Sequence, residues 1–130
     1  MVVDASALMA FFLKESGSET VKKALEKGGL LISSVNRTEV KGKLVGSGTY
    51  TPQLVDARID LLKDVLEVVA FDAEQSDVAA FYYARRNPYN LSLGDSACLA
   101  LAEVSQQVVL TAEQAWKKLP DLPFKVVLIR

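Results

Sequence analysis

The chain has 130 residues, and its hydrophobic share of 50% is enough to fill the core of one compact domain, residues 1–130. The absence of histidine excludes Ser-His-Asp and Cys-His catalysis, histidine zinc sites and two-histidine ribonuclease chemistry, so carboxylates become the natural catalytic candidates. Because the formal net charge is only -1, any contact with nucleic acid must depend on local basic patches or bound cations.

The single cysteine, Cys98, excludes an intrachain disulfide and a cysteine zinc cluster, and it fits a reducing cytoplasm. Small and apolar residues surround it, so we expect it to pack in the core rather than to act as a reactive thiol. No apolar run approaches the ~20 residues that span a bilayer, and a charge already stands at Asp4. We therefore expect an unexported, cytoplasmic protein that makes no membrane contact.

Apolar and β-branched runs recur along the chain, separated by longer stretches of helical composition. We predict strands at residues 2–3, 30–32, 65–71, 108–110 and 126–129. We predict helices at residues 5–14, 18–27, 34–46, 52–64, 73–86, 93–105 and 112–118. This alternation predicts βαβ units and therefore an α/β fold with a mostly parallel sheet covered on both faces.

Several of these helices have recognisable boundary signals. Ser92-Leu93-Gly94-Asp95 matches the Ser-x-x-acid capping box, and Thr111-Ala112-Glu113-Gln114 matches its Thr-x-x-Gln form. Pro52 can occupy the first turn after Thr51, and Gly28-Gly29 ends a helix before the second strand.

Four acidic residues lie near the ends of predicted strands: Asp4, Glu39, Asp95 and Glu113. Asp4 closes the first strand, and Glu39 lies in the early turns of the helix after the second. The helix that begins near Asp95 must descend so that the strand at 108–110 can ascend, and Glu113 follows that strand. In a parallel sheet all four therefore share the carboxyl edge, where open α/β sheets bind ligands.

Helix capping is the alternative role for most of these acids taken singly, because carboxylates near helix N-termini are stabilised by the helix dipole. Asp95 fills a capping box, and Asp4 can cap the helix that starts at Ala5. Glu113 can be an ordinary acid in the first turn of its helix. The case for a shared site depends on their convergence.

Glu39 is harder to explain as a cap. It shares a helical face with Val35 and Gly42, which predicts partial burial and a need for a cation or several hydrogen bonds. The alternative is that Glu39 reaches solvent or pairs with Lys43, four residues later.

A site built from carboxylate oxygens suits hard cations, so we predict that it holds Mg²⁺ or Mn²⁺, as one or two ions. The absence of histidine disfavours zinc. Such an ion can acidify water, neutralise a phosphodiester and stabilise the leaving oxygen, which phosphodiester hydrolysis requires.

Four segments carry a resemblance to a known family: VVDASAL at 2–8, SSVNRTEV at 33–40, LSLGDSACLALA at 91–102 and VLTAEQAW at 109–116. Together they resemble the PIN-domain ribonucleases, in particular the small toxins of the VapC type. The third segment is the most specific, and the match spans nearly the whole chain.

The resemblance implies an α/β/α sandwich around the parallel sheet and a metal-dependent RNA endonuclease. It implies that Asp4, Glu39 and Asp95 bind the metal, with Ser6 and Thr111 as nearby polar groups. The fourth acid of the family is usually aspartate in a Thr-Ala-Asp sequence, whereas this chain has Glu113. The extra methylene leaves either direct coordination or a contact through water.

The resemblance also implies a homodimer and a cognate antitoxin as partner. Phe11-Phe12-Leu13 cannot all face one core from a helix, so we expect at least one of them to meet a partner, the alternative being burial between helices.

Basic residues near the predicted site are candidate contacts for an RNA substrate, although charged surface residues are usually only solvated. The candidates are Arg37, Lys41, Lys43, Arg85 and Arg86. The main rival to the nuclease is a non-catalytic PIN-like module that binds RNA or protein, in which the acids merely cap helices.

Overall fold

The computed structural model describes residues 1–130 and contains a single sheet in which every strand pair is parallel. Its spatial order is β3-β2-β1-β4-β5, so the shortest strand, β1, lies at the centre. The strands are β1 (Val2–Val3), β2 (Leu30–Ser33), β3 (Leu66–Val69), β4 (Val109–Thr111) and β5 (Val126–Leu128). The predicted α/β fold with a parallel sheet is confirmed.

Six α-helices and one 3-10 helix join these strands. They are α1 (Ala5–Leu13), α2 (Ser18–Lys27), α3 (Ser34–Gly46), α4 (Pro52–Asp60), α5 (Ala73–Ala84), α6 (Leu93–Ser105) and the 3-10 helix η1 (Gln114–Lys118). The predicted ranges of α2, α3 and α6 are confirmed to the residue. The predicted helices at 5–14 and 73–86 are slightly too long.

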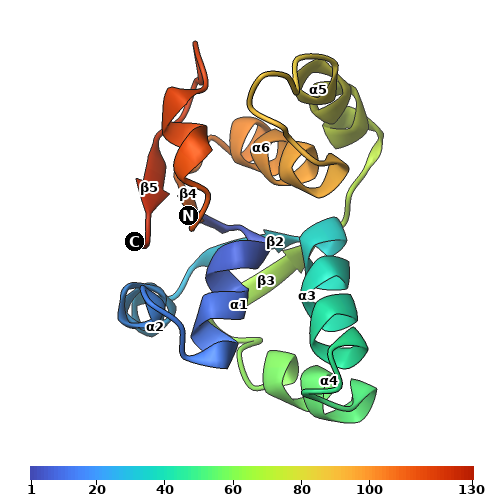
Figure 1. Ribbon diagram of the computed structural model, residues 1–130, viewed down its shortest axis with the longest axis vertical. Helices are drawn as coiled ribbons and strands as arrows, with labels where there is room; N and C mark the ends of the chain where they lie inside the picture. Colours follow the sequence, from blue (N-terminus) through green and yellow to red (C-terminus); the bar gives the residue numbers. More distant parts are fainter.

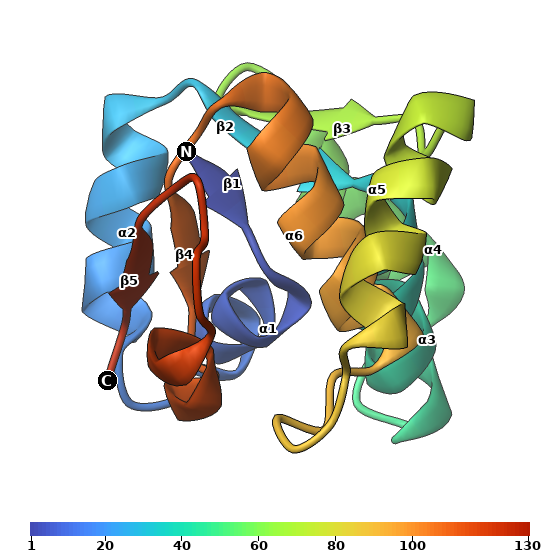
Figure 2. The same ribbon diagram turned by 90° about the horizontal axis from the view of Figure 1, so that it is seen from above.

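The sheet separates two apolar cores, and the alternating side chains of β1 show this division. Val3 packs with residues of α1 to α4, whereas Val2 packs with residues of α5, α6 and η1. Figure 1 shows the resulting layers, with α5 and α6 on one side of the sheet and α1 to α4 on the other. Figure 2 looks down on α5 and α6, with β2 and β3 behind them and β1, β4 and β5 to their left.

Side-chain caps fix where the helices begin, and so where the polar residues after each strand lie. Asp4 caps α1 by accepting a hydrogen bond from the Ser6 amide, and Ser33 caps α3 in the same way through the Val35 amide. Ser92 and Asp95 form a complete capping box at the start of α6. These three helices therefore begin at the carboxyl edge of the sheet.

Three predicted elements need correction. The helix predicted at 52–64 ends at Asp60, because residues 61–65 form turns before β3, which is shorter than the predicted 65–71. The helix predicted at 112–118 is only η1, and the capping box predicted for Thr111 to Gln114 is absent. The Thr111 hydroxyl donates instead to Asp4, and the Gln114 side-chain amide donates to the carbonyl of Arg130.

None of the helices combines the length and the apolar character that crossing a lipid bilayer requires.

Candidate metal centre

Asp4 is a buried carboxylate between β1 and α1, with 3% of its surface exposed. Its Oδ2 accepts hydrogen bonds from the Ser6 hydroxyl at 2.6 Å, the Thr111 hydroxyl at 3.0 Å and the Ser6 amide at 3.3 Å. Oδ1 accepts none, and it is not sealed from solvent. The polar roles predicted for Ser6 and Thr111 thus take a definite form, because both hold one oxygen of Asp4.

The pKa of Asp4 is raised to about 6, chiefly by burial and to a smaller extent by the nearby charge of Asp95. The hydrogen bonds from Ser6 and Thr111 act in the opposite direction, because they favour the ionised form. Asp4 is therefore a carboxylate whose charge is poorly compensated by the protein alone.

Glu39 is half-buried on α3, as its helical face predicted. Its Oε1 accepts a hydrogen bond from the Asn36 side-chain amide at 2.7 Å, and Oε2 accepts none. The carboxylate packs against the backbone of Gly94, where a methyl group would lie 2.7 Å from Oε2. The alternative pairing with Lys43 is not formed, since the ion pairs in the structure involve only Arg37, Lys41 and Asp56.

Asp95 has the capping role that its sequence predicted. Its Oδ2 accepts from the Ser92 amide at 2.9 Å, while its own amide donates to the Ser92 hydroxyl at 3.0 Å. Its Oδ1 accepts no hydrogen bond, so capping uses only half of this carboxylate.

Three of the acids lie near the buried thiol of Cys98. It is fully buried on α6, which confirms its packing role, and burial raises the pKa of its thiol well above the usual value. Asp4, Asp95 and Glu39 raise that pKa further, because their negative charges oppose ionisation of the thiol.

Glu113 differs from the other three acids. Its side chain is exposed and accepts no hydrogen bond, and its amide donates to the Thr111 hydroxyl at 3.0 Å. It stands just before η1 and does not contribute to the pKa shifts of Asp4 or Cys98.

The donor set fits a hard cation in chemistry, although the side chains do not form a closed cage. No group of three or more acidic or cysteine side chains is close enough to hold an ion as the side chains stand. Each of the three acids nevertheless has one oxygen fixed by hydrogen bonds and a second that accepts none. Oxygen ligands with such freedom suit Mg²⁺ or Mn²⁺, which keep several waters in their coordination shell.

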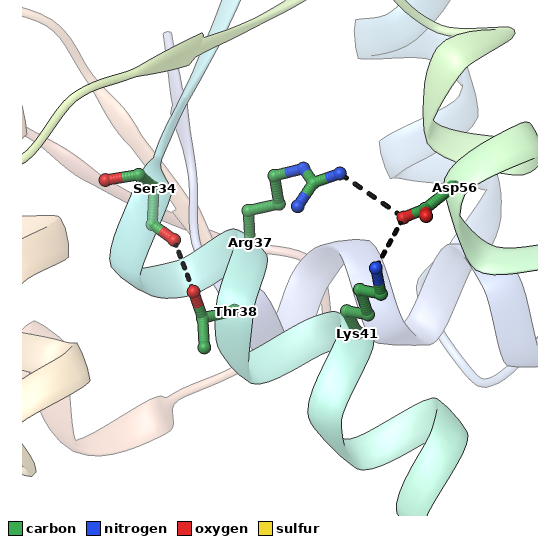
Figure 3. A network of polar contacts seen from close by, with 5 residues as sticks. All are labelled: Ser34, Arg37, Thr38, Lys41 and Asp56. Atoms are coloured by element: carbon green, nitrogen blue, oxygen red, sulfur yellow. Dashed lines mark hydrogen bonds and ion pairs between the residues drawn. The ribbon is translucent and has the colours of Figure 1, made fainter. Parts of the chain in front are cut away.

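The basic residues proposed for RNA contact differ in whether an acidic side chain pairs with them. Arg37 and Lys41 both pair with Asp56 on α4, at 3.5 Å and 2.8 Å, while Thr38 bonds back to the Ser34 carbonyl (Figure 3). The pKa of Asp56 is held below its usual value, chiefly by the hydrogen bond from Lys41. One carboxylate therefore already pairs with both of these basic residues.

The remaining three basic candidates have no acidic partner. Lys43 is exposed on α3, and Arg85 lies over the ring of Phe81 at 3.7 Å. Arg86 lies over the ring of Tyr83 at 4.5 Å, and its carbonyl accepts from the Leu91 amide. That backbone bond closes the loop that leads into α6, so Arg86 is held near the helix start that carries Asp95.

Sequence reasoning missed two residues at this centre, Asn36 and Gly94. Asn36 is fully buried, and its amide also donates to the Gly94 carbonyl at 2.9 Å. The available signal was spacing, because Asn36 precedes Glu39 by three residues and so lies on the same helical face. The contact with Gly94 crosses between two helices and leaves no such signal.

Known proteins resemble this chain at the level of both sequence and fold. The family model for the PIN domain matches residues 1–122. The chain is 33% identical over 117 residues to VapC ribonuclease Mb2780c of Mycobacterium bovis, covering 85% of this chain and 88% of that protein. Ribonuclease VapC42 of Mycobacterium tuberculosis gives the same values.

Solved structures share the fold at lower sequence identity. The crystal structure of VapBC2 from Rickettsia felis, bound to a DNA fragment from its promoter, contains a chain with a TM-score of 0.71 and 14% identity, covering 98% of this chain and 96% of that one. A toxin–antitoxin complex from Klebsiella pneumoniae contains a chain with a TM-score of 0.70 and 21% identity, covering 99% and 97% respectively.

Proposed function

This chain belongs to the PIN-domain family and, within it, to the VapC group, and from this premise we propose that it is a metal-dependent endoribonuclease, the toxin of a toxin–antitoxin pair. The observation that carries the proposal is the set of three carboxylates around Cys98, each with one oxygen that accepts no hydrogen bond. The names of the relatives support ribonuclease activity as the reaction.

Asp4, Glu39 and Asp95 would hold Mg²⁺ or Mn²⁺, as one or two ions, with Glu113 at the exposed rim contributing directly or through water. When bound, the ion supplies an activated water and neutralises the phosphodiester. Hydrolysis forms one bond from a water oxygen to phosphorus and breaks one P–O bond of the RNA backbone, and the proton lost by the water is balanced by the one that the leaving oxygen gains. Ser6 and Thr111 keep Asp4 Oδ2 fixed, which leaves Oδ1 as the oxygen that can reach a ligand.

The experiment that tests the proposal is cleavage of total cellular RNA by the purified chain, with mapping of the cut sites. We expect cleavage with Mg²⁺ or Mn²⁺ and none after EDTA, with activity restored when the ion is returned in excess. Unchanged cleavage in EDTA would contradict the metal dependence. The cut sites would identify the RNA class at the same time.

A non-catalytic PIN-like module that binds RNA or protein is the second candidate. It is favoured by one observation, namely that Asp4 and Asp95 cap helices while no preformed cage of three acids exists. A correctly folded chain that binds neither Mg²⁺ nor Mn²⁺ and cleaves no RNA would support this candidate over the nuclease.

Arg86, Arg85 and Lys43 are the basic residues that we propose for contact with RNA phosphates, because no carboxylate neutralises them. Arg86 is the strongest of these, since its loop leads directly into α6 and since the adjacent Tyr83 has 39% of its surface exposed. An arginine stacked on an exposed aromatic ring can bind a phosphate while the ring contacts a base. Arg37 and Lys41 would contribute less, because Asp56 competes for them.

Replacing Arg86 by alanine should weaken binding of a fluorescent single-stranded RNA several-fold and should reduce the slope of log affinity against log salt by about one. The matched control is Arg58→Ala, because Arg58 also lies over a tyrosine ring, Tyr50 at 5.8 Å, but on α4. Fluorescence anisotropy in EDTA measures binding without cleavage. Equal losses in the two variants would show that the effect is only one of net charge.

A groove between α1, α2 and α4 is the surface that we propose for the antitoxin. It has a volume of about 440 Å³, and its basic residues outnumber its single acid, Glu19. Its lining is Phe11, Phe12, Lys14, Ser18, Glu19, Lys22, Arg58, Leu61 and Leu62. Leu61 is 80% exposed, so an apolar antitoxin segment that carries acidic residues would fit both the shape and the charge.

Burial in the chain's own core accounts for Phe12 in the Phe11-Phe12-Leu13 segment, and contact with a partner is proposed for the exposed part of the segment. Phe12 is buried in the core beneath the groove, whereas Leu13 has 38% of its surface exposed. A short reading frame directly upstream of this gene should encode a chain that co-purifies with it, and light scattering of the free chain should report the proposed homodimer. A monomeric chain, or a neighbouring product that does not bind, would count against these assignments.

A further inference from the structure

We propose that Asn36 is a positioning residue that clamps the Glu39 carboxylate against the first turn of α6 and so presents the free oxygen of Glu39 to the metal. The inference rests on the metal site in the proposed function. It gives a role to Asn36 and Gly94. Helix capping, core packing and direct metal coordination do not explain the arrangement of these two residues.

The two N–H groups of the Asn36 amide bridge two helices. One donates to Glu39 Oε1 at 2.7 Å within α3, and the other donates to the Gly94 carbonyl at 2.9 Å on α6. Both partners can only accept, so the opposite orientation of the amide would place its oxygen against two other oxygens. The side chain of Asn36 is fully buried, which leaves it little freedom to choose other partners.

Gly94 completes the clamp because it has no side chain. The three atoms nearest to an added methyl group all belong to the Glu39 carboxylate, with Oε2 at 2.7 Å and the other two closer. The carboxylate therefore lies against the backbone of Gly94 and is held there by Asn36. Since Gly94 directly precedes Asp95, this arrangement connects two of the proposed metal ligands.

The remaining atom of the amide is an energetic cost of the clamp. Asn36 Oδ1 is buried and has no hydrogen-bond partner, which destabilises the fold. One other buried amide has the same defect: Gln75 on α5 donates to the Ala70 carbonyl at 3.0 Å, and its Oε1 has no partner. Gln75 forms no hydrogen bond with Asp4, Glu39 or Asp95 and is therefore a matched control for the energetic effect of removing such an amide.

Titration of the metal-free full chain with Mn²⁺, followed by electron paramagnetic resonance, tests the clamp without any RNA. Asn36→Ala should weaken Mn²⁺ binding by about 10- to 100-fold, the range found when groups that orient metal ligands are removed. Gln75→Ala should change the melting temperature by about as much as Asn36→Ala does. It should leave the Mn²⁺ affinity unchanged. Equal Mn²⁺ affinities of Asn36→Ala and the wild type would overturn the proposal.

Gly94→Ala is a second variant, in which Mn²⁺ affinity should fall without a fall in melting temperature. Alanine favours the helix, so the melting temperature in EDTA should stay constant or rise, while the displaced Glu39 should weaken Mn²⁺ binding. In a Glu39→Gln background, Asn36→Ala should cause no further loss, because the amide acts through Glu39. A full additional loss in that background would contradict the clamp.

Failure of the inference is distinguishable from failure of the proposed function. Wild-type chain that binds Mn²⁺ but cleaves no RNA would refute the nuclease and leave the clamp to be judged by the affinities of the variants. Wild-type chain that binds no Mn²⁺ would refute the metal site and the clamp together.

Discussion

Asp4→Asn is expected to abolish RNA cleavage and, at the same time, to raise the melting temperature of the metal-free chain at pH 7 by several degrees. Asparagine keeps an oxygen that can accept from Ser6 and Thr111, but it carries no charge with which to bind a metal. Cleavage of labelled RNA with Mg²⁺ and thermal unfolding in EDTA measure the two effects.

The expected gain in stability follows from the direction of the Asp4 pKa shift. The pKa rises from its model-compound value of 3.8 to about 6 in the folded chain, so between these values the folded state binds a proton that the unfolded chain releases. Protonated Asp4 makes its full contribution to the free energy of unfolding below about pH 4. This contribution is lost as the pH rises through about 6. The difference amounts to roughly 3 kcal/mol at pH 7.

The pH dependence itself supplies the control. In EDTA, the wild-type chain should lose stability between about pH 4 and pH 6 relative to Asp4→Asn, and the two curves should run parallel above that range. Saturating Mg²⁺ should stabilise the wild type and not the variant. Cleavage by Asp4→Asn at the wild-type rate would refute the role of Asp4 in the metal site.

Asp95→Asn is expected to abolish cleavage as well, but without the gain in stability expected of Asp4→Asn, because the lost helix-terminal charge offsets the relief of its repulsion with Asp4. Asparagine can still accept from the Ser92 amide, so the capping geometry survives while the negative charge at the N-terminus of α6 is lost. Such a charge stabilises a helix by about 0.3–1 kcal/mol. The same cleavage and unfolding measurements apply.

Ser92→Ala is the matched control that separates capping from chemistry. It removes the hydroxyl that accepts from the Asp95 amide and leaves the Asp95 carboxylate and its bond to the Ser92 amide in place. The variant should lose about 1 kcal/mol of stability and still cleave RNA. If Ser92→Ala lost activity to the same extent as Asp95→Asn, helix integrity rather than the carboxylate would explain both results.

The sequence predicted the fold well where a helix boundary or strand has a cause in the neighbouring residues. The capping box at Ser92, the paired glycines after α2 and the alternation of strands and helices each have a local cause, and the structure contains all three. The segment after β4 was predicted wrongly because Thr111 resembles a helix cap. Its hydroxyl is instead used by Asp4, a partner 107 residues away.

The candidate centre was predictable to the level of which acids lie near which strand ends. Chain direction alone indicated the edge at which Asp4, Glu39 and Asp95 lie. The detailed environment of Glu39 was not predictable, because it depends on a contact between Asn36 and Gly94 across 58 residues. The surroundings of Glu113 were also predicted wrongly, because the sequence suggests an α-helix at 112–118 where the structure has the 3-10 helix η1.

The three buried or half-buried acids are each anchored by a different neighbour: Asp4 by hydroxyls, Glu39 by an amide and Asp95 by its own helix start. The proposed ligands can therefore be adjusted unequally. Variants of Ser6 and Asn36 would change the proposed metal affinity through Asp4 and Glu39 separately, whereas the Asp95 carboxylate is held by a backbone amide and has no side-chain anchor to vary.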